Sequence, residues 1–317
     1  MHVAAEGLIA VGLLAGGLAA SRAAGLPLPF GRAWLAATTA SRAAAAPQVR
    51  VDIITAAGGR AVLVSSEGHA VLIDGGAGPT GEAVVARLHA LGLAGLQAAY
   101  MTRGNTSAAA GLIAVMDEVP VQRLYDLVPG NSCPAHQGVL ADARAHNVPV
   151  GTAQRGSSLR IGPAQVQVLW PAAELGGAQS VGASSPGLVR LVDGQVRMLF
   201  ADGLPVSELP SIERLASEMG AQVLEVPGGG SSGSLPAALL SEVAPRLALL
   251  EPSSSGPAPS VLGELAAAHI LGVDVGRSSD LYLETDGRGL TLGLDAGEPG
   301  VAPSSAESPP PATGPCA

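Results

Sequence analysis

Short apolar runs that alternate with segments of helical spacing constrain this chain more than any other feature. From Gln48 onward, three β-type runs separated by glycine-containing turns open the pattern, at 51–54, 61–65 and 70–74. Short apolar runs bounded by such turns are typical of antiparallel strands joined by hairpins. A segment of helical spacing at 81–91 follows, then a strand at 96–101 and a single helix at 107–116, and strands and helices alternate as far as residue 146.

The second half of the chain repeats this order. Further strands are expected at 148–153, 158–161, 165–170, 188–192 and 196–201, with a tight turn at Asp193-Gly194 between the last two. Helices and strands then alternate at 206–219, 222–226, 235–243, 247–250 and 261–268, before two closing strands at 281–285 and 290–294. Strands followed by alternating units, twice over, favour two packed sheets with helices outside. We therefore predict an α/β domain over residues 48–297, built as a four-layer αββα sandwich.

The two ends of the chain differ from this domain. Residues 1–47 hold an uncharged apolar segment at 7–20, which predicts a membrane anchor or a signal segment. Residues 298–317 are rich in proline and serine, so a disordered tail is expected there. The sequence therefore predicts a membrane-associated protein and leaves the side of the membrane open, an exported domain included.

Charge and cysteine content limit the functions that fit the chain. Its 317 residues include 17 basic ones, all arginine, and 26 acidic ones, which gives a net charge of −9. Such an acidic domain repels a phosphate backbone, so broad nucleic-acid binding is disfavoured. Cys133 and Cys316 are too few for a disulfide framework or a metal knuckle, and we expect two unpaired thiols.

Five segments in a fixed order carry a resemblance to a known family. They are LIDGG at 72–76, MTRGNTSAAAGL at 101–112, LFADG at 199–203, VLEVPGGGS at 223–231 and ETDGRG at 284–289. Together they resemble the hydrolytic β-lactamase-like domain of ComEC, the membrane protein of bacterial DNA uptake. The resemblance covers about residues 48–293 and implies a metallo-β-lactamase-like sandwich.

The departures from this family fall on its metal ligands. Active members hold one or two divalent metals with His and Asp side chains, and the metals activate a water for hydrolysis. An arginine at such a position places a permanent positive charge where the metal belongs, and glycine or alanine offers no ligand. The matching positions here are Arg103, Asn105, Ser107, Ala108, Gly228 and Gly229. The resemblance therefore implies a degenerate site that binds no metal.

Other candidate residues receive structural interpretations. Asp74 matches a family position that shapes its loop, and we expect it to accept backbone N–H bonds in the following Gly75-Gly76 turn. The serine-rich stretch 230–234 lacks the spacing of a nucleophile elbow and predicts a helix cap. The histidines of the domain show no metal-binding spacing, so surface or supporting positions are expected for them, with His136 in a loop.

The sequence leaves three interpretations of function open. The first is a catalytically inactive relative of the ComEC domain, a structural or interaction component held at the membrane by its N-terminal segment beside a competence-type membrane channel. The second is a zinc- or manganese-dependent hydrolase whose site has shifted to Asp202, Asn105 and Asp74. Asp202 lies one residue away from the family's bridging aspartate.

The third interpretation is an anion-binding module. Arg103 would act together with the backbone amides of a loop that precedes a helix, since helix N-termini and exposed amides attract phosphate groups. The loop residues are Gly229, Gly230, Ser231 and Ser232.

Overall fold

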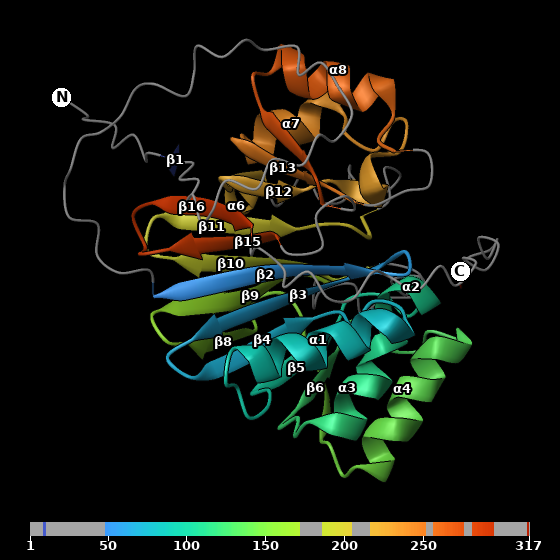
Figure 1. Ribbon diagram of the computed structural model, residues 1–317. Coiled ribbons are helices and arrows are strands. Elements are labelled where there is room, and N and C mark those ends of the chain that lie inside the picture. The colour runs from blue at the N-terminus through green and yellow to red at the C-terminus, as the bar shows by residue number, and fades with distance from the viewer. Residues whose placement is uncertain are drawn as a thin grey trace, which may run out of the picture.

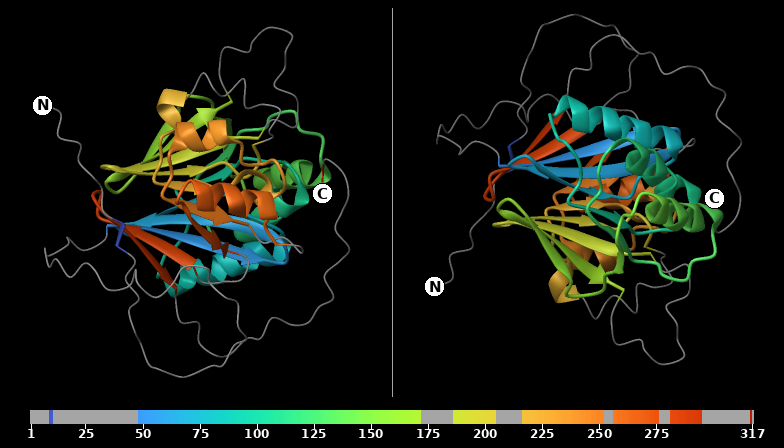
Figure 2. Two further views of the ribbon diagram at one scale, coloured as in Figure 1. Left: turned by 90° about the horizontal axis from the view of Figure 1, so that it is seen from above. Right: turned by 90° about the horizontal axis from the view of Figure 1, so that it is seen from below.

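Two mixed sheets packed face to face, with helices on their outer faces, form the molecule (Figures 1 and 2). The computed structural model describes residues 9–10, 48–171, 186–204, 216–251, 256–275, 281–294 and 316. This arrangement confirms the predicted four-layer αββα sandwich. Most of the predicted N-terminal segment, the predicted tail apart from residue 316, and most of the helix expected at 206–219 lie outside the described residues.

The first sheet has nine strands in the order β1-β16-β15-β2-β3-β4-β5-β6-β7. Strands β16 to β4 pair antiparallel, whereas β4 to β7 pair parallel because helices connect them. The strands are β1 (Ile9–Ala10), β2 (Val49–Ala56), β3 (Gly59–Ser66), β4 (His69–Ile73), β5 (Ala98–Met101), β6 (Leu124–Asp126), β7 (Val150–Thr152), β15 (Leu281–Thr285) and β16 (Leu290–Leu294).

The second sheet has seven strands in the order β14-β13-β12-β11-β10-β9-β8. These are β8 (Ser158–Ile161), β9 (Ala164–Trp170), β10 (Leu188–Asp193), β11 (Val196–Phe200), β12 (Val223–Glu225), β13 (Leu247–Leu250) and β14 (Leu271–Asp274). Strand β14 was not predicted, because this edge strand is half-exposed and its Leu-Gly-Val-Asp sequence shows neither an apolar run nor a turn signal.

Helices cover the outer face of each sheet. Helices α1 (Gly78–Ala90), α2 (Thr106–Ala109), α3 (Gly111–Glu118) and α4 (Pro134–Ala145) lie on the side of the first sheet, and α6 (Ala216–Met219), α7 (Ala237–Val243) and α8 (Pro259–Ala267) on that of the second (Figure 1). The single helix expected at 107–116 is divided into α2 and α3 at Ala110. Within the described residues, every helix is too short or too polar to cross a membrane.

Small aliphatic side chains fill the space between the sheets. Val62 and Val64 from β3 meet a layer that includes Val166 and Val189 from the facing sheet, and all four are at most 1% exposed. Alternate residues of these strands point to opposite faces, so the other face of β3 packs under the helices. This alternation explains why a chain with 2% aromatic residues still builds a continuous core.

The carboxyl ends of several strands meet at one edge of the sandwich. Strand β4 ends before Asp74, β5 ends before Thr102, and β13 ends before Glu251. Loops that follow neighbouring parallel strands emerge on the same side of a sheet, and this is where α/β proteins place their sites. The charged side chains described below come from these strand ends, except Arg60, which lies at the amino end of the antiparallel strand β3.

The two cysteines are joined, which contradicts the expectation of unpaired thiols. Cys133, at the start of α4, forms a disulfide with Cys316, and their Cα atoms are 5.2 Å apart. Local spacing does not reveal this bond, because the two cysteines are 183 positions apart in the sequence.

Candidate functional site between the sheets

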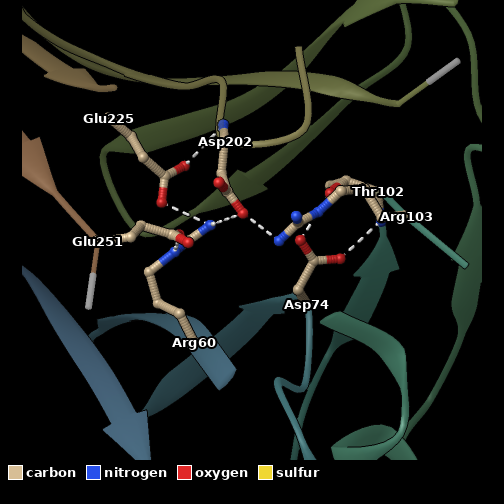
Figure 3. A network of polar contacts seen from close by, with 7 residues as sticks. All are labelled: Arg60, Asp74, Thr102, Arg103, Asp202, Glu225 and Glu251. Atoms are coloured by element: carbon tan, nitrogen blue, oxygen red, sulfur yellow. Dashed lines mark hydrogen bonds and ion pairs between the residues drawn. The ribbon is translucent and has the colours of Figure 1, made fainter. Parts of the chain in front are cut away.

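A buried guanidinium links the two sheets at this edge (Figure 3). Arg60, from β3, is 3% exposed. Its Nη2 atom lies 2.5 Å from a carboxylate oxygen of Glu225 on β12, and its Nε atom donates to Glu251 at the end of β13. The same Nη2 is 3.7 Å from Asp202 Oδ2. The guanidinium of Arg60 therefore lies within ion-pair distance of three carboxylates that come from the second sheet.

A second guanidinium completes the network. Arg103 forms an ion pair with the carboxylate of Asp202, which is 5% exposed (Figure 3). Arg103 comes from the first sheet and Asp202 from the loop after β11, so this contact also joins the two sheets. Asp202 thus lies between the two arginines. Below, the six residues Arg60, Asp74, Arg103, Asp202, Glu225 and Glu251 are called the arginine–carboxylate network.

Asp74 is the network residue that follows β4, and it binds the loop that follows β5. Its two carboxylate oxygens accept from Thr102, one from the backbone N at 2.7 Å and one from Oγ1 at 2.6 Å. The expectation that Asp74 would accept bonds in the Gly75-Gly76 turn is wrong, because both glycine N–H groups donate to the carbonyl of Ala108. Asp74 therefore fixes the loop that carries Arg103.

The network contains more acidic than basic groups, and burial adjusts their protonation. Burial raises the pKa of Glu225 well above its ordinary value, against the opposing charge of Arg60. Burial and the charge of Glu251 raise the pKa of Asp202 to about 6, although Arg103 and Arg60 oppose the shift. Burial also acts on Glu251, but Arg60 and Arg103 outweigh it and lower the pKa of that group. Protons therefore supply part of the charge balance that the two arginines leave incomplete.

The glycine-rich loop packs against the network through backbone and not through side chains. Gly228, Gly229 and Gly230 all have positive φ within a short 3-10 turn, η4 (Pro227–Gly230). The N–H of Gly228 donates to the carbonyl of Asp202 at 2.8 Å. A Cβ at position 229 would lie 3.3 Å from the Cβ of Glu251. Because L-residues rarely adopt this backbone, the loop favours glycine at all three positions.

Asn105, Ser107 and Ala108, which the resemblance matches to metal ligands, have structural positions. Asn105 is the residue before α2, but its side chain does not cap that helix, and its buried Oδ1 has no hydrogen-bond partner among the described residues. Ser107 is half-buried in α2. Ala108 is fully buried, and its carbonyl accepts the two bonds from Gly75 and Gly76.

The serine-rich stretch does not cap a helix as expected. Helix α7 begins at Ala237, and its N-cap residue is Pro236. Ser234 is buried, and its Oγ has no hydrogen-bond partner within the described part of the chain. The prediction failed because the helix begins later than its apolar pattern suggested.

One histidine was placed wrongly. His136, expected in a loop, lies in the first turn of α4 and is fully buried. Its Nε2 lies 2.9 Å from Asp126 Oδ2, and Asp126 Oδ1 accepts from the N–H of Val128 at 2.9 Å. This pair fastens α4 to the end of β6 and lies outside the arginine–carboxylate network.

The donor set of the network does not fit a divalent metal. A metal needs carboxylate oxygens or imidazole nitrogens that are free to coordinate it. Here Arg60 and Arg103 already engage Asp202, Glu225 and Glu251, and two permanent positive charges oppose a cation. We therefore derive no metal-dependent step.

Sequence reasoning missed three of the six network residues. Arg60, Glu225 and Glu251 lie inside or at the end of strands whose neighbours are apolar. A charged residue within an apolar strand was an available signal, because such a side chain is almost never buried unless it is paired. The sequence did not show which groups pair.

The two mixed sheets, the helices outside them and the strand-end site define a metallo-β-lactamase-like α/β sandwich. Neither a protein-family model nor a curated protein sequence matches the chain. The chain is similar to solved structures that are described as metallo-β-lactamases or as related folds.

Three solved structures illustrate this likeness. Zn²⁺-bound PqqB from Methylobacterium extorquens is 15% identical, with a TM-score of 0.47 over 71% of this chain and 97% of PqqB. The metallo-β-lactamase fold protein YhfI from Bacillus subtilis is 14% identical, with a TM-score of 0.44 over 71% of this chain and 95% of YhfI. A mutant metallo-β-lactamase from Cronobacter sakazakii is 16% identical, with a TM-score of 0.37 over 56% and 75%. At these identities the likeness concerns the fold alone.

Proposed function

We propose that this domain is a catalytically inactive relative of the ComEC β-lactamase-like domain and acts as a structural or interaction component. The observation that carries the proposal is the arginine–carboxylate network. Arg60 and Arg103 form ion pairs with Asp202, Glu225 and Glu251 at the edge where the resemblance would place the metals. The connection to DNA uptake and to a competence-type membrane channel rests on the order of the five sequence motifs.

The network supports this proposal on energetic grounds. Several buried carboxylates without a counter-charge would cost several kcal/mol each in desolvation. The resemblance implies that a resident metal offsets this cost in active members, and the two guanidiniums offset part of it here. Arg60 and Arg103 join the sheets as fixed parts of the fold, so Asp202 is engaged and is not free to activate water.

The anion-binding alternative has less support from the same geometry. The guanidinium of Arg103 faces Asp202, and the charges of Glu251 and Asp74 also act on it. Because the network holds four carboxyl groups and two arginines, its net charge opposes a phosphate group at neutral pH. Phosphate binding is therefore an outcome for the test and not the proposal.

The disulfide supports a location for the domain. Disulfides persist in oxidising compartments and are rare in the cytosol, where thiols are kept reduced. We propose that residues 48–297 lie outside the cytoplasm, attached to the membrane or exported through the N-terminal segment. Treating intact cells with a membrane-impermeant thiol reagent after mild reduction tests this: labelling of Cys133 and Cys316 is expected, and labelling only after lysis would overturn it.

Metal content tests the proposed inactivity. The full chain, purified in detergent, is incubated with zinc or manganese, desalted and examined by elemental analysis and by hydrolysis of a phosphodiester. We expect metal well below one ion per chain and no metal-dependent hydrolysis. Stoichiometric metal with hydrolysis that Asp202→Asn abolishes would establish the shifted-site hydrolase instead. Phosphate-dependent stabilisation that Arg103→Met removes would establish the anion-binding module.

A further inference from the structure

The disulfide holds the end of the chain beside the loop that carries Arg103. Besides the bond to Cys133, the carbonyl of Cys316 accepts hydrogen bonds from Thr106, one from the backbone N and one from Oγ1, both at 3.3 Å. Thr106 is the first residue of α2 and lies three positions after Arg103. The chain end is therefore attached covalently at α4 and by hydrogen bonds at α2.

The loop before Cys133 packs on the same segment. The side-chain Oδ1 of Asn131 accepts from the N–H of Cys133 at 2.8 Å. A Cβ at Gly104 would lie 2.6 Å from Cγ of Asn131, so the backbone next to Arg103 fits closely against this side chain. Cys133, Asn131 and the 103–106 loop thus form one packed unit, and closely packed groups transmit a local change to their neighbours.

We propose that the Cys133–Cys316 disulfide is a redox-sensitive strap that holds the 103–106 loop in place and is opened by a dithiol reductant. When the strap opens, the hydrogen bonds from Thr106 to Cys316 lose their covalent support. The 103–106 loop then gains freedom, and this change reaches the ion pair between Arg103 and Asp202. The proposal concerns the disulfide and does not depend on the proposed function.

The positions of the two sulfurs favour one direction of attack. Cys133 is 4% exposed, whereas Cys316 is half-buried. A thiolate of the dithiol therefore attacks Sγ of Cys316, forms a mixed disulfide and expels Cys133 as a thiolate. Cys133 is the N-cap residue of the 12-residue helix α4, and the dipoles at this helix end favour the negative charge that leaves.

The second half of the exchange completes the balance. The second thiol of the reductant attacks the reductant sulfur that is bonded to Cys316 and expels Cys316 as a thiolate. The reductant ends as a disulfide after giving two electrons, and its two protons pass to the two cysteine thiolates. Thioredoxin-like dithiols are the class of partner that carries out such an exchange.

Hydrogen exchange with thiol trapping tests the proposal on the full chain. Dithiothreitol is the probe dithiol, and alkylation at each step counts the free thiols. We expect two free thiols to appear together as the reductant is raised, and amide exchange in residues 103–109 to rise by about tenfold or more. Exchange in β2 and β3 should stay unchanged. Unchanged exchange at 103–109 after complete reduction would overturn the strap.

Variants separate loss of the strap from general unfolding. Cys316→Ser and the double variant Cys133→Ser/Cys316→Ser should show the raised exchange at 103–109 without reductant and should not respond to it. Thr106→Val keeps the disulfide and should raise exchange less than Cys316→Ser does. If a variant fails to fold, the reductant titration of the wild-type protein tests the proposal by itself. Amide exchange that rises throughout the domain at once would show that the disulfide stabilises the whole fold, and this would overturn a local strap.

Discussion

Arg60 on β3 and Glu225 on β12 form an ion pair across the two sheets, with Nη2 2.5 Å from the nearer carboxylate oxygen. Both side chains are at most 3% exposed. A buried ion pair between the two sheets fixes their relative position, and breaking it is costly. A water-accessible ion pair contributes far less to the free energy of unfolding. This contact therefore connects the stability of the domain to the arginine–carboxylate network.

Loss of this arginine should be costly. Arg60→Met leaves Glu225 and Glu251 buried without their main counter-charge, so we expect a loss of about 3–5 kcal/mol in the free energy of unfolding. Adding Glu225→Gln should recover part of that loss, because it removes one of the unpaired charges. Urea denaturation of the full chain measures both. Equal stability of wild type and Arg60→Met would show that the network does not stabilise the fold.

The stability of the domain should fall as pH rises between about 4 and 6. The folded-state pKa of Asp202 is about 6, above its ordinary value of 3.8, so in this window the folded state holds more protons than the unfolded state. The slope from Asp202 approaches 1.4 kcal/mol per pH unit at most. Glu225 acts in the same direction, and Glu251 in the opposite one at lower pH.

Asp202→Asn is the control for this pH dependence. It keeps the size of the side chain and removes the titrating group, so the slope between pH 4 and 6 should become shallower. Denaturant midpoints at a series of pH values measure it. The same slope in both proteins would assign the effect to other groups.

A side chain at Gly229 should destabilise the loop next to the network. Gly229 has φ of +64°, and a Cβ there would meet the Cβ of Glu251 at 3.3 Å. Gly233 also has positive φ, +79°, but no atom lies within 4 Å of its Cβ position. We expect Gly233→Ala to lower the free energy of unfolding by about 1 kcal/mol through backbone strain alone, and Gly229→Ala to lower it further. Thermal unfolding compares the two, and equal costs would show that the contact with Glu251 is unimportant.

The buried histidine of α4 should contribute far more to stability than the exposed histidine at the C-cap of that helix. His136 is fully buried and lies 2.9 Å from a carboxylate oxygen of Asp126. His136→Ala removes this partner and leaves a cavity, so a loss of about 2–4 kcal/mol is expected. The Nε2 atom of His146 lies 3.0 Å from Oδ1 of the exposed Asp117. His146→Ala should therefore lower the free energy of unfolding by less than about 1 kcal/mol. A similar loss in both variants would contradict the assignment.

Several parts of the fold could be predicted because they depend on local patterns. The run 247–250 was predicted as a strand and is strand β13 with the same bounds. The Asp193-Gly194 turn was expected between two strands, and it joins β10 to β11. In each case the apolar runs and turn residues that define the element are neighbours in the chain.

The sequence by itself predicted the two-sheet sandwich and most of its strands and helices in their order. Only the tertiary structure decided which charged side chains and which cysteines meet. Arg60 and Glu251 are 191 residues apart, and Cys133 and Cys316 are 183 residues apart. Periodicity reports which face of an element is buried, but it does not report which strand ends meet. The physical reason is that a buried charge finds its partner only when two sheets have packed together and excluded water between them.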